Sequence, residues 1–152
     1  MPNASHITVA TVVERDGAYL FVEERVNDQL VLNQPAGHWE ENETLFEGAV
    51  RETLEETGWD VELTGLVGIY EFKPEDLEYG FLRFAFAARA LRHHAERSLD
   101  EGIARAVWLT RDEVAAYPCH RSPMVIRCLN DFHSGRRLPL DVIGHLTPPL
   151  PR

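Results

Sequence analysis

The sequence predicts an α/β sandwich in which a mixed central sheet is covered by helices. Strand-like segments rich in β-branched and apolar residues lie on both sides of one strongly marked helix, and two further helical segments follow the last of them. A chain of 152 residues with 44% hydrophobic content is long enough for one domain with its own core. We therefore expect a single domain over residues 1–146 and a proline-rich tail over residues 147–152.

Turn residues separate the expected elements. Before the helix, strands are expected at 6–13 and 18–24, followed by a short segment at 30–33, with turns at residues 15–17 and 27–28 and a break at residues 34–37. After the helix, strands are expected at 61–72, with bends or bulges at Gly65 and Gly68, and at 81–90 and 103–109. Residues 73–80 and 92–102 are expected as loops, and 110–117 and 122–134 as helices.

The central helix has recognisable ends. Thr44 and Glu47 have the spacing of a capping box, in which each residue bonds the backbone of the other. Gly58 suits the left-handed position that follows a helix. Within the helix, Arg51 lies one turn from both Glu47 and Glu55 and can pair with either.

One side of this helix is acidic. Glu52, Glu55 and Glu56 have offsets that stack side chains on one face. Carboxylates this close repel one another unless a cation lies between them, and carboxylate oxygens are the preferred ligands of hard divalent cations. Gly48 lies in the acidic arc and leaves space in front of the carboxylates. Taken alone, a charged helix face is more often a solvated surface.

Composition excludes several classes of protein. A formal net charge of −10 argues against a nucleic-acid-binding protein, and no apolar run has the length of a membrane span. The first residues lack the pattern of a signal peptide, and Cys119 and Cys128 are read as reduced thiols with packing roles. The histidines show no metal-ligand spacing, so zinc is not expected. We expect a cytoplasmic protein with no nucleic-acid or membrane partner.

The acidic helix belongs to a longer pattern, Gly37-x5-Glu43-x7-Arg51-Glu52-x2-Glu55-Glu56-x-Gly58. This pattern resembles the box of the Nudix hydrolase family. It departs from that box only slightly, with Thr53 where the family prefers an aliphatic residue and Trp59 as an unusual closing residue. The resemblance implies an α/β/α Nudix sandwich and Mg²⁺-dependent hydrolysis of nucleoside diphosphates linked to another group, with Mn²⁺ as the alternative metal. Because every charged position is filled, we interpret the acidic face as a metal site.

Outside the box, the chain is similar to the NudJ-type phosphatase subgroup. The similarity lies in the segments HITVATVV, NQPAGH, FLRFAFA, Arg121-Ser122-Pro123 and SGRRLPLDVIG. It implies release of phosphate from nucleoside tri- and diphosphates and from the hydroxymethylpyrimidine pyrophosphate of thiamine synthesis.

The resemblance also implies roles for the residues of the box. The expected metal ligands are Glu55 and Glu56, joined by the backbone carbonyl of Gly37. Glu52 is either a further ligand or the base that activates water. In related enzymes, the base instead comes from an acidic loop, for which Asp100 and Glu101 are the candidates here, with Glu101 favoured. Glu43, Arg51 and Gly58 are expected to support the site.

Substrate contacts are expected from Arg83, Gln34, His38 and Arg25. An arginine within an apolar strand is as readily an edge or snorkelling residue, and a histidine in a loop is as readily a satisfied loop residue. Trp39, Tyr70 and Tyr79 are candidates for stacking on a base, although packing in the core or at its rim is the commoner role of such residues.

Three functions remain open from the sequence. The first is a Mg²⁺-dependent phosphohydrolase that releases phosphate from small nucleotide or pyrophosphate substrates, acting as a monomer or homodimer. The second is a pyrophosphatase for oxidised nucleotides or ADP-ribose. The third is a nucleotide-sensing Nudix domain that binds without hydrolysis, against which the intact set of carboxylates counts.

Overall fold

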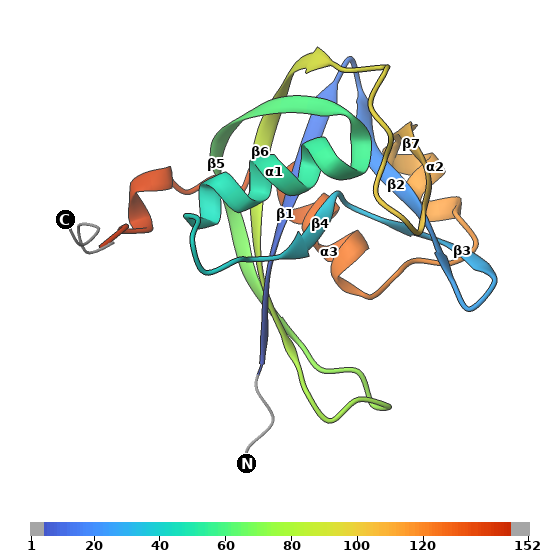
Figure 1. The fold of residues 1–152 in the computed structure, drawn as a ribbon, viewed down its shortest axis with the longest axis horizontal. Helices are drawn as coiled ribbons and strands as arrows, with labels where there is room; N and C mark the ends of the chain where they lie inside the picture. Colours follow the sequence, from blue (N-terminus) through green and yellow to red (C-terminus); the bar gives the residue numbers. More distant parts are fainter. Residues whose placement is uncertain (1–4, 147–152) are drawn as a thin grey trace.

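A computed structural model describes residues 5–146, which form a mixed sheet with helices on both faces (Figure 1). The strands within this range are β1 (His6–Arg15), β2 (Ala18–Val26), β3 (Gln29–Asn33), β4 (Ala36–His38), β5 (Trp59–Phe72), β6 (Phe81–His93) and β7 (Ile103–Thr110). The helices are α1 (Leu45–Thr57), α2 (Arg111–Ala116) and α3 (Met124–His133), with a short 3-10 turn at Leu140–Val142. The expected α/β sandwich is confirmed. The expected tail at 147–152 lies outside the described residues.

Strand β1 is the centre of the sheet. It runs parallel to β6 and antiparallel to β4, and β5 pairs antiparallel with the far side of β6. At its C-terminal end β1 also pairs with β2, and β2 pairs antiparallel with both β3 and β7. Parallel and antiparallel pairs therefore occur together, as the prediction of a mixed sheet requires.

Strand β4 corrects the sequence prediction of a simple break at residues 34–37. Ala36 and His38 are in register with Ala10 and Thr8 of β1. A strand of three residues has no periodic pattern to detect, because it is defined by pairing with a partner distant in the chain. The other differences are at the ends of elements: β5 begins at Trp59, β6 continues to His93, and α3 begins at Met124.

Helix α1 has the predicted ends. The Thr44 hydroxyl accepts from Glu47 N, and the Glu47 carboxylate accepts from Thr44 N. Gly58 has a φ of 77° and donates its N–H to the Leu54 carbonyl. Because Glu47 serves in the cap, Arg51 pairs with Glu55 and not with Glu47.

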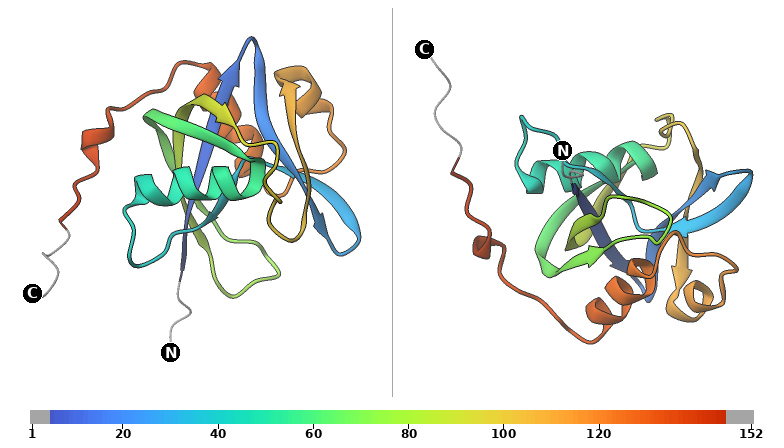
Figure 2. Two further views of the ribbon diagram at one scale, coloured as in Figure 1. Left: turned by 45° about the horizontal axis from the view of Figure 1, so that its top comes forward. Right: turned by 90° about the horizontal axis from the view of Figure 1, so that it is seen from below.

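The two faces of the sheet are covered by different helices (Figure 2). On one face, α1 packs through Ala49 in a core cluster that includes Val9, Leu66 and Phe86. On the other face, α3 packs through Val125 and Leu129. Hydrophobic burial on both faces fixes α1 against the sheet, and with it the direction of the acidic face.

Strand β5 is irregular at the predicted glycines. Its register against β6 shifts between Leu63 and Gly65 and again between Leu66 and Gly68, so both predicted bulges are confirmed. A side chain at Gly68 would lie 2.7 Å from the Tyr70 hydroxyl, which explains the glycine there. Within residues 5–146, no helix is long and apolar enough to cross a membrane.

Candidate metal and substrate site

Carboxylates from α1 meet an aspartate from the loop between β6 and β7. Oxygen atoms of Glu52, Glu55 and Asp100 all lie within 4.8 Å of one another. The loop is attached to the end of α1 by its backbone, since Asp100 N donates to Glu55 O at 3.0 Å and His94 N donates to Gly58 O at 2.7 Å. Gly58 therefore ends the helix at the point where the loop attaches.

The neighbouring acid, Glu101, occupies a different position. It is exposed and lines the large cavity beside the cluster, whereas Asp100 belongs to the carboxylate group itself. The sequence named both residues, and the structure places them differently: Asp100 lies beside Glu52 and Glu55, and Glu101 lines the cavity.

Glu56 is the most buried carboxylate of the helix. Its side chain accepts a hydrogen bond from Ala36 N at 2.9 Å, which ties α1 to β4. Burial raises the pKa of Glu56 to about 9, and repulsion from Glu24, Glu52 and Asp100 acts in the same direction. Burial likewise raises the pKa of Glu52. Such shifts mark groups that gain from a nearby cation.

Gly37 allows the backbone of β4 to lie directly against Glu52. A Cβ atom at this position would fall 2.2 Å from the Glu52 side-chain carboxyl carbon, a distance at which one group must move. The backbone of Gly37 is thus next to a carboxylate of the cluster, where its carbonyl was expected to contribute.

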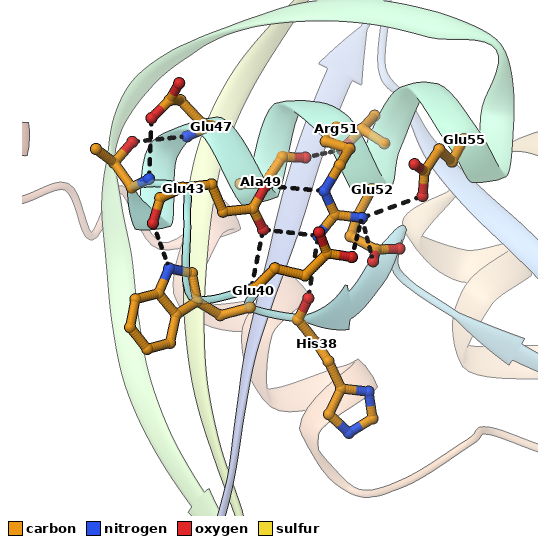
Figure 3. A network of polar contacts seen from close by, with 11 residues as sticks. His38, Glu40, Glu43, Glu47, Ala49, Arg51, Glu52 and Glu55 are labelled. Carbon is orange, nitrogen blue, oxygen red and sulfur yellow. Dashed lines mark hydrogen bonds and ion pairs between the residues drawn. The ribbon is translucent and has the colours of Figure 1, made fainter. Parts of the chain in front are cut away.

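Arg51 connects the acidic residues (Figure 3). Its guanidinium donates to both oxygens of Glu43, at 2.9 and 2.7 Å, and to Glu52 and Glu55, at 2.8 and 3.1 Å. It also donates to the His38 carbonyl at 3.1 Å. Arg51 holds the pKa of Glu43 below its usual range. A fork of fixed donors can orient several carboxylates at once, which is the supporting arrangement expected for Arg51 and Glu43.

The position of Glu43 also explains why residue 48 of the helix is a glycine. A Cβ at Gly48 would lie 2.7 Å from a Glu43 carboxylate oxygen. The space in front of the acidic face is thus occupied by the carboxylate that holds Arg51. Trp39 stabilises the loop that carries Glu43, because its indole N–H donates to the Glu43 carbonyl at 2.8 Å.

The carboxylate group has the chemistry of a site for a hard divalent cation. Its donors are oxygens, they converge within one coordination sphere, and the single arginine that contacts them leaves other oxygens available. The pKa of Glu56 is raised mainly by burial and further by repulsion from its acidic neighbours, and a cation between these groups would relieve that repulsion. The residues present therefore fit Mg²⁺ or Mn²⁺.

A cavity of about 1310 Å³ opens beside the carboxylates. Acidic side chains enter it from β2, α1 and the β6–β7 loop: Glu24, Glu52, Glu56 and Glu101. Apolar and aromatic side chains enter it from β5, β6, the loop between them and α3: Phe72, Leu77, Tyr79, Phe81, Met124 and Ile126. Such a cavity can hold a charged group and a planar apolar group of one ligand.

Three of the four predicted substrate residues line this cavity: Arg25, His38 and Arg83. Arg83 is 4% exposed, and its guanidinium donates to Gln34 and Asn33 at 3.0 and 3.2 Å. Gln34 is fully buried, donates to Val125 O at 2.7 Å and does not line the cavity, so it supports Arg83 instead of facing a ligand.

Of the remaining candidates, His38 and Tyr79 line the cavity and Tyr70 does not. The His38 ring bonds the His6 ring at 2.8 Å, and burial together with His6 lowers the pKa of His38. Tyr79 lines the cavity and stacks on His6 with ring centroids 4.2 Å apart. Tyr70 is a core residue whose hydroxyl donates to Asp131 at 2.8 Å, so packing is its role.

Sequence reasoning missed Glu24 and Asn33. Asn33 accepts from Arg83 and donates to Glu24 at 3.1 Å, so both residues link the arginine to the acidic side of the cavity. The sequence signal was weak: a polar residue closing a short apolar segment, and an acid near a strand end. Their convergence depends on the pairing of β2 with β3.

Comparisons with known proteins agree with this geometry. The family model described as NUDIX domain matches residues 4–125. The chain belongs to the Nudix hydrolase family. It is 37% identical over 139 residues to phosphatase NudJ of Escherichia coli strain K12, covering 91% of this chain and 90% of that protein. The same figures hold for phosphatase NudJ of Shigella flexneri.

Solved Nudix structures show the same fold. A Nudix hydrolase from Nitrosomonas europaea superposes with a TM-score of 0.91 at 40% identity, covering 93% of this chain and 97% of that one. The Nudix domain of Shewanella oneidensis NrtR, solved with ADP ribose, superposes with a TM-score of 0.66 at 16% identity, covering 86% of this chain and 90% of that one, and at that identity it shows the fold alone. This Nudix hydrolase thus has the fold and the enzyme class that its box predicted.

Proposed function

We propose that this chain is a Mg²⁺-dependent phosphohydrolase, with Mn²⁺ as the alternative metal. It releases orthophosphate from nucleoside tri- and diphosphates, and hydroxymethylpyrimidine pyrophosphate is a further substrate to test. The relatives named phosphatase NudJ, similar over most of both chains, support phosphate release as the reaction. The proposal includes a cytoplasmic location and a monomer or homodimer, which ultracentrifugation can distinguish.

One observation carries the metal proposal: oxygens of Glu52, Glu55 and Asp100 converge within 4.8 Å, and the buried Glu56, which is outside this group, is close enough to interact electrostatically with Glu52 and Asp100. Without a cation, three carboxylates in this arrangement repel one another. Glu56 is only 8% exposed, whereas the carboxylates of a solvated helix face are exposed to water. The arrangement is the one that binding a divalent cation requires.

The residues have separable tasks in this reaction. When bound, Mg²⁺ neutralises phosphate charge and lowers the pKa of an attacking water. Glu55, Glu56 and the Gly37 carbonyl hold the metal, and Asp100 is a further ligand because its oxygen lies in the same group. Arg51 keeps Glu52 and Glu55 in fixed orientations through bonds of 2.8 and 3.1 Å.

The proton of the attacking water is taken by Glu52 or Glu101. Glu52 belongs to the carboxylate group, and burial raises the pKa of its side chain. Glu101 lines the cavity from the substrate side. Substituting each with Gln separates the two, since loss of the base lowers kcat and removes the acidic limb of the pH–rate profile.

The decisive experiment is Glu56→Gln, assayed for orthophosphate release from nucleoside triphosphates and diphosphates in Mg²⁺. We expect activity to fall by about 10³-fold or more, because a buried ligand of the metal loses its charge. Glu41→Gln is the matched control: Glu41 is an exposed loop residue, and this change should leave the rate unaltered. Full activity of Glu56→Gln, with circular dichroism unchanged, would contradict the proposal.

Product analysis separates the alternative functions. A pyrophosphatase for oxidised nucleotides yields nucleoside monophosphate and pyrophosphate, and one for ADP-ribose yields AMP and ribose phosphate. The phosphatase instead releases orthophosphate in successive steps. A sensing domain would bind nucleotide tightly by calorimetry and form no product over hours in Mg²⁺.

A further inference from the structure

Two buried polar atoms among the described residues have no hydrogen-bond partner: Thr8 Oγ1 and Arg83 Nε. Thr8 is 8% exposed and Arg83 is 4% exposed. Buried polar groups are almost always hydrogen-bonded, because leaving one unpaired carries a desolvation penalty. If the two unpaired atoms lie close together, one missing hydrogen-bond partner can account for both.

The two residues are direct neighbours in the sheet. Thr8 of β1 is in register with Arg83 of β6, and on its other side Thr8 is in register with His38 of β4. Residues in one row across a sheet face the same side, so these three side chains share a face. Both Thr8 and Arg83 line the large cavity, and each carries one of the two unpaired atoms.

The guanidinium is held in place by neutral groups. Its two terminal nitrogens donate to the side-chain oxygens of Gln34 and Asn33. The Cys128 thiol, whose pKa is raised by burial, also interacts with the guanidinium as a neutral group. Among the described residues, no carboxylate forms an ion pair with Arg83, unlike Arg51 in the metal site. A buried charge without a counter-charge is unfavourable, so its complement is an anion from outside the chain.

We propose that Thr8 and Arg83 form a binding subsite for a phosphoryl group of the substrate, distinct from the carboxylate group that holds the metal. Arg83 Nε and the Thr8 hydroxyl each donate a hydrogen bond to phosphoryl oxygen. The proposal rests on the proposed function in one respect: the phosphoryl group is carried by the substrate that the metal site hydrolyses.

Charge decides between a phosphoryl oxygen and a carbonyl oxygen of the base. A carbonyl could accept the same hydrogen bonds, yet it would leave the guanidinium charge uncompensated in a buried site. The aromatic residues Phe72, Tyr79 and Phe81, which line the same cavity, provide the apolar surface that suits a base. The subsite would therefore fix the orientation of the ligand, with its phosphates towards Arg83 and its organic group towards the aromatic side chains.

The first test measures binding of inorganic pyrophosphate by calorimetry in EDTA, where no metal contributes. Thr8→Val and Arg83→Gln are compared with the wild type and with controls of the same chemistry, Thr64→Val in β5 and Arg89→Gln in β6, both at exposed positions. We expect roughly tenfold weaker binding for Thr8→Val and at least about tenfold for Arg83→Gln, because each removes a hydrogen bond to a charged group. The controls should bind like the wild type.

The second test uses stability, since a structural role and a ligand-binding role have opposite effects. Thr8→Val keeps the shape of the side chain and removes an unpaired buried hydroxyl, so its unfolding temperature should equal or exceed that of the wild type, by up to about 2–4 °C. A lower unfolding temperature would mean that the hydroxyl has a structural partner, and the subsite would be rejected.

Further outcomes are distinguishable from failure of the proposed function. Equal pyrophosphate binding by the wild type and both variants, or none by the wild type, overturns the subsite while wild-type phosphatase activity is unaffected. Unchanged pyrophosphate binding with altered preference among nucleoside monophosphates of different bases assigns the pair to a base carbonyl and also overturns it. Loss of pyrophosphate binding in both variants, with the controls unchanged, supports the subsite even if the metal assignment fails.

Discussion

At the scale of single residues, the site depends on close approach between a backbone and a carboxylate. Glu52 lies against Gly37 so closely that any side chain there would overlap it, with a Cβ only 2.2 Å from the carboxyl carbon. The glycine is needed for space, and not for a left-handed backbone, because its φ is not positive. Substitution at this position should therefore act on the site more than on the chain conformation.

Gly37→Ala is predicted to displace the Glu52 carboxylate and lower kcat by about 10²-fold, since an ångström of misplacement at a reacting site has an effect of this size. The assay is phosphate release in saturating Mg²⁺. Gly144→Ala is the control, because a Cβ there meets nothing within 4 Å and φ is not positive. Equal activities of the two variants would show that the contact between residues 37 and 52 is unimportant.

At the scale of elements, the β6–β7 loop carries Asp100 to the end of α1. Backbone bonds connect the loop to Gly58 and Glu55, and the His94 side chain bonds Asp60 of β5 at 2.6 Å. His94 is not among the residues that line the cavity, and its bonds to Gly58 and Asp60 fix the start of the loop. We therefore expect it to act by positioning Asp100.

His94→Ala is predicted to reduce kcat about tenfold and to weaken Mn²⁺ binding, because Asp100 loses a fixed position. Electron paramagnetic resonance titration of Mn²⁺ measures the second effect, which a merely structural role would not produce at temperatures well below unfolding. Arg97→Ala, an exposed residue of the same loop, is the control. Unaltered Mn²⁺ affinity in His94→Ala would show that the loop is held by its backbone bonds alone.

The elements also show what sequence can and cannot predict. The ends of α1 were predictable because caps are local: Thr44, Glu47 and Gly58 lie within the segment they terminate. Strand β4 was not, because its only definition is pairing with β1, far away in the chain. The same reason applies to Asp100 and Glu101: the position of Asp100 beside α1 depends on backbone bonds between the loop and the helix, which no local pattern in the sequence indicates.

At the scale of the whole molecule, the sheet brings together what the chain keeps apart. Glu24, Glu56 and Asp100 come from β2, α1 and the β6–β7 loop, and their mutual repulsion contributes to the raised pKa of Glu56. The fold holds these charges together against repulsion, as sites that trade stability for function commonly do. If a divalent cation binds here, as we propose, metal binding should be linked to the stability of the whole domain.

Thermal unfolding in excess Mg²⁺ or Mn²⁺ is accordingly predicted to occur at a higher temperature than in EDTA. At a metal concentration 100 times the Kd, binding to the native state contributes about 2.7 kcal/mol, which corresponds to a rise of about 5–10 °C for a chain of this size. Asp100→Asn should reduce the rise and should itself unfold at a higher temperature in EDTA, because one of the repelling charges is gone. Asp112→Asn, at an exposed position in α2, should behave like the wild type in both conditions. An equal rise in Asp100→Asn and wild type would remove Asp100 from the metal site, since a ligand that contributes to binding must contribute to the linked stability.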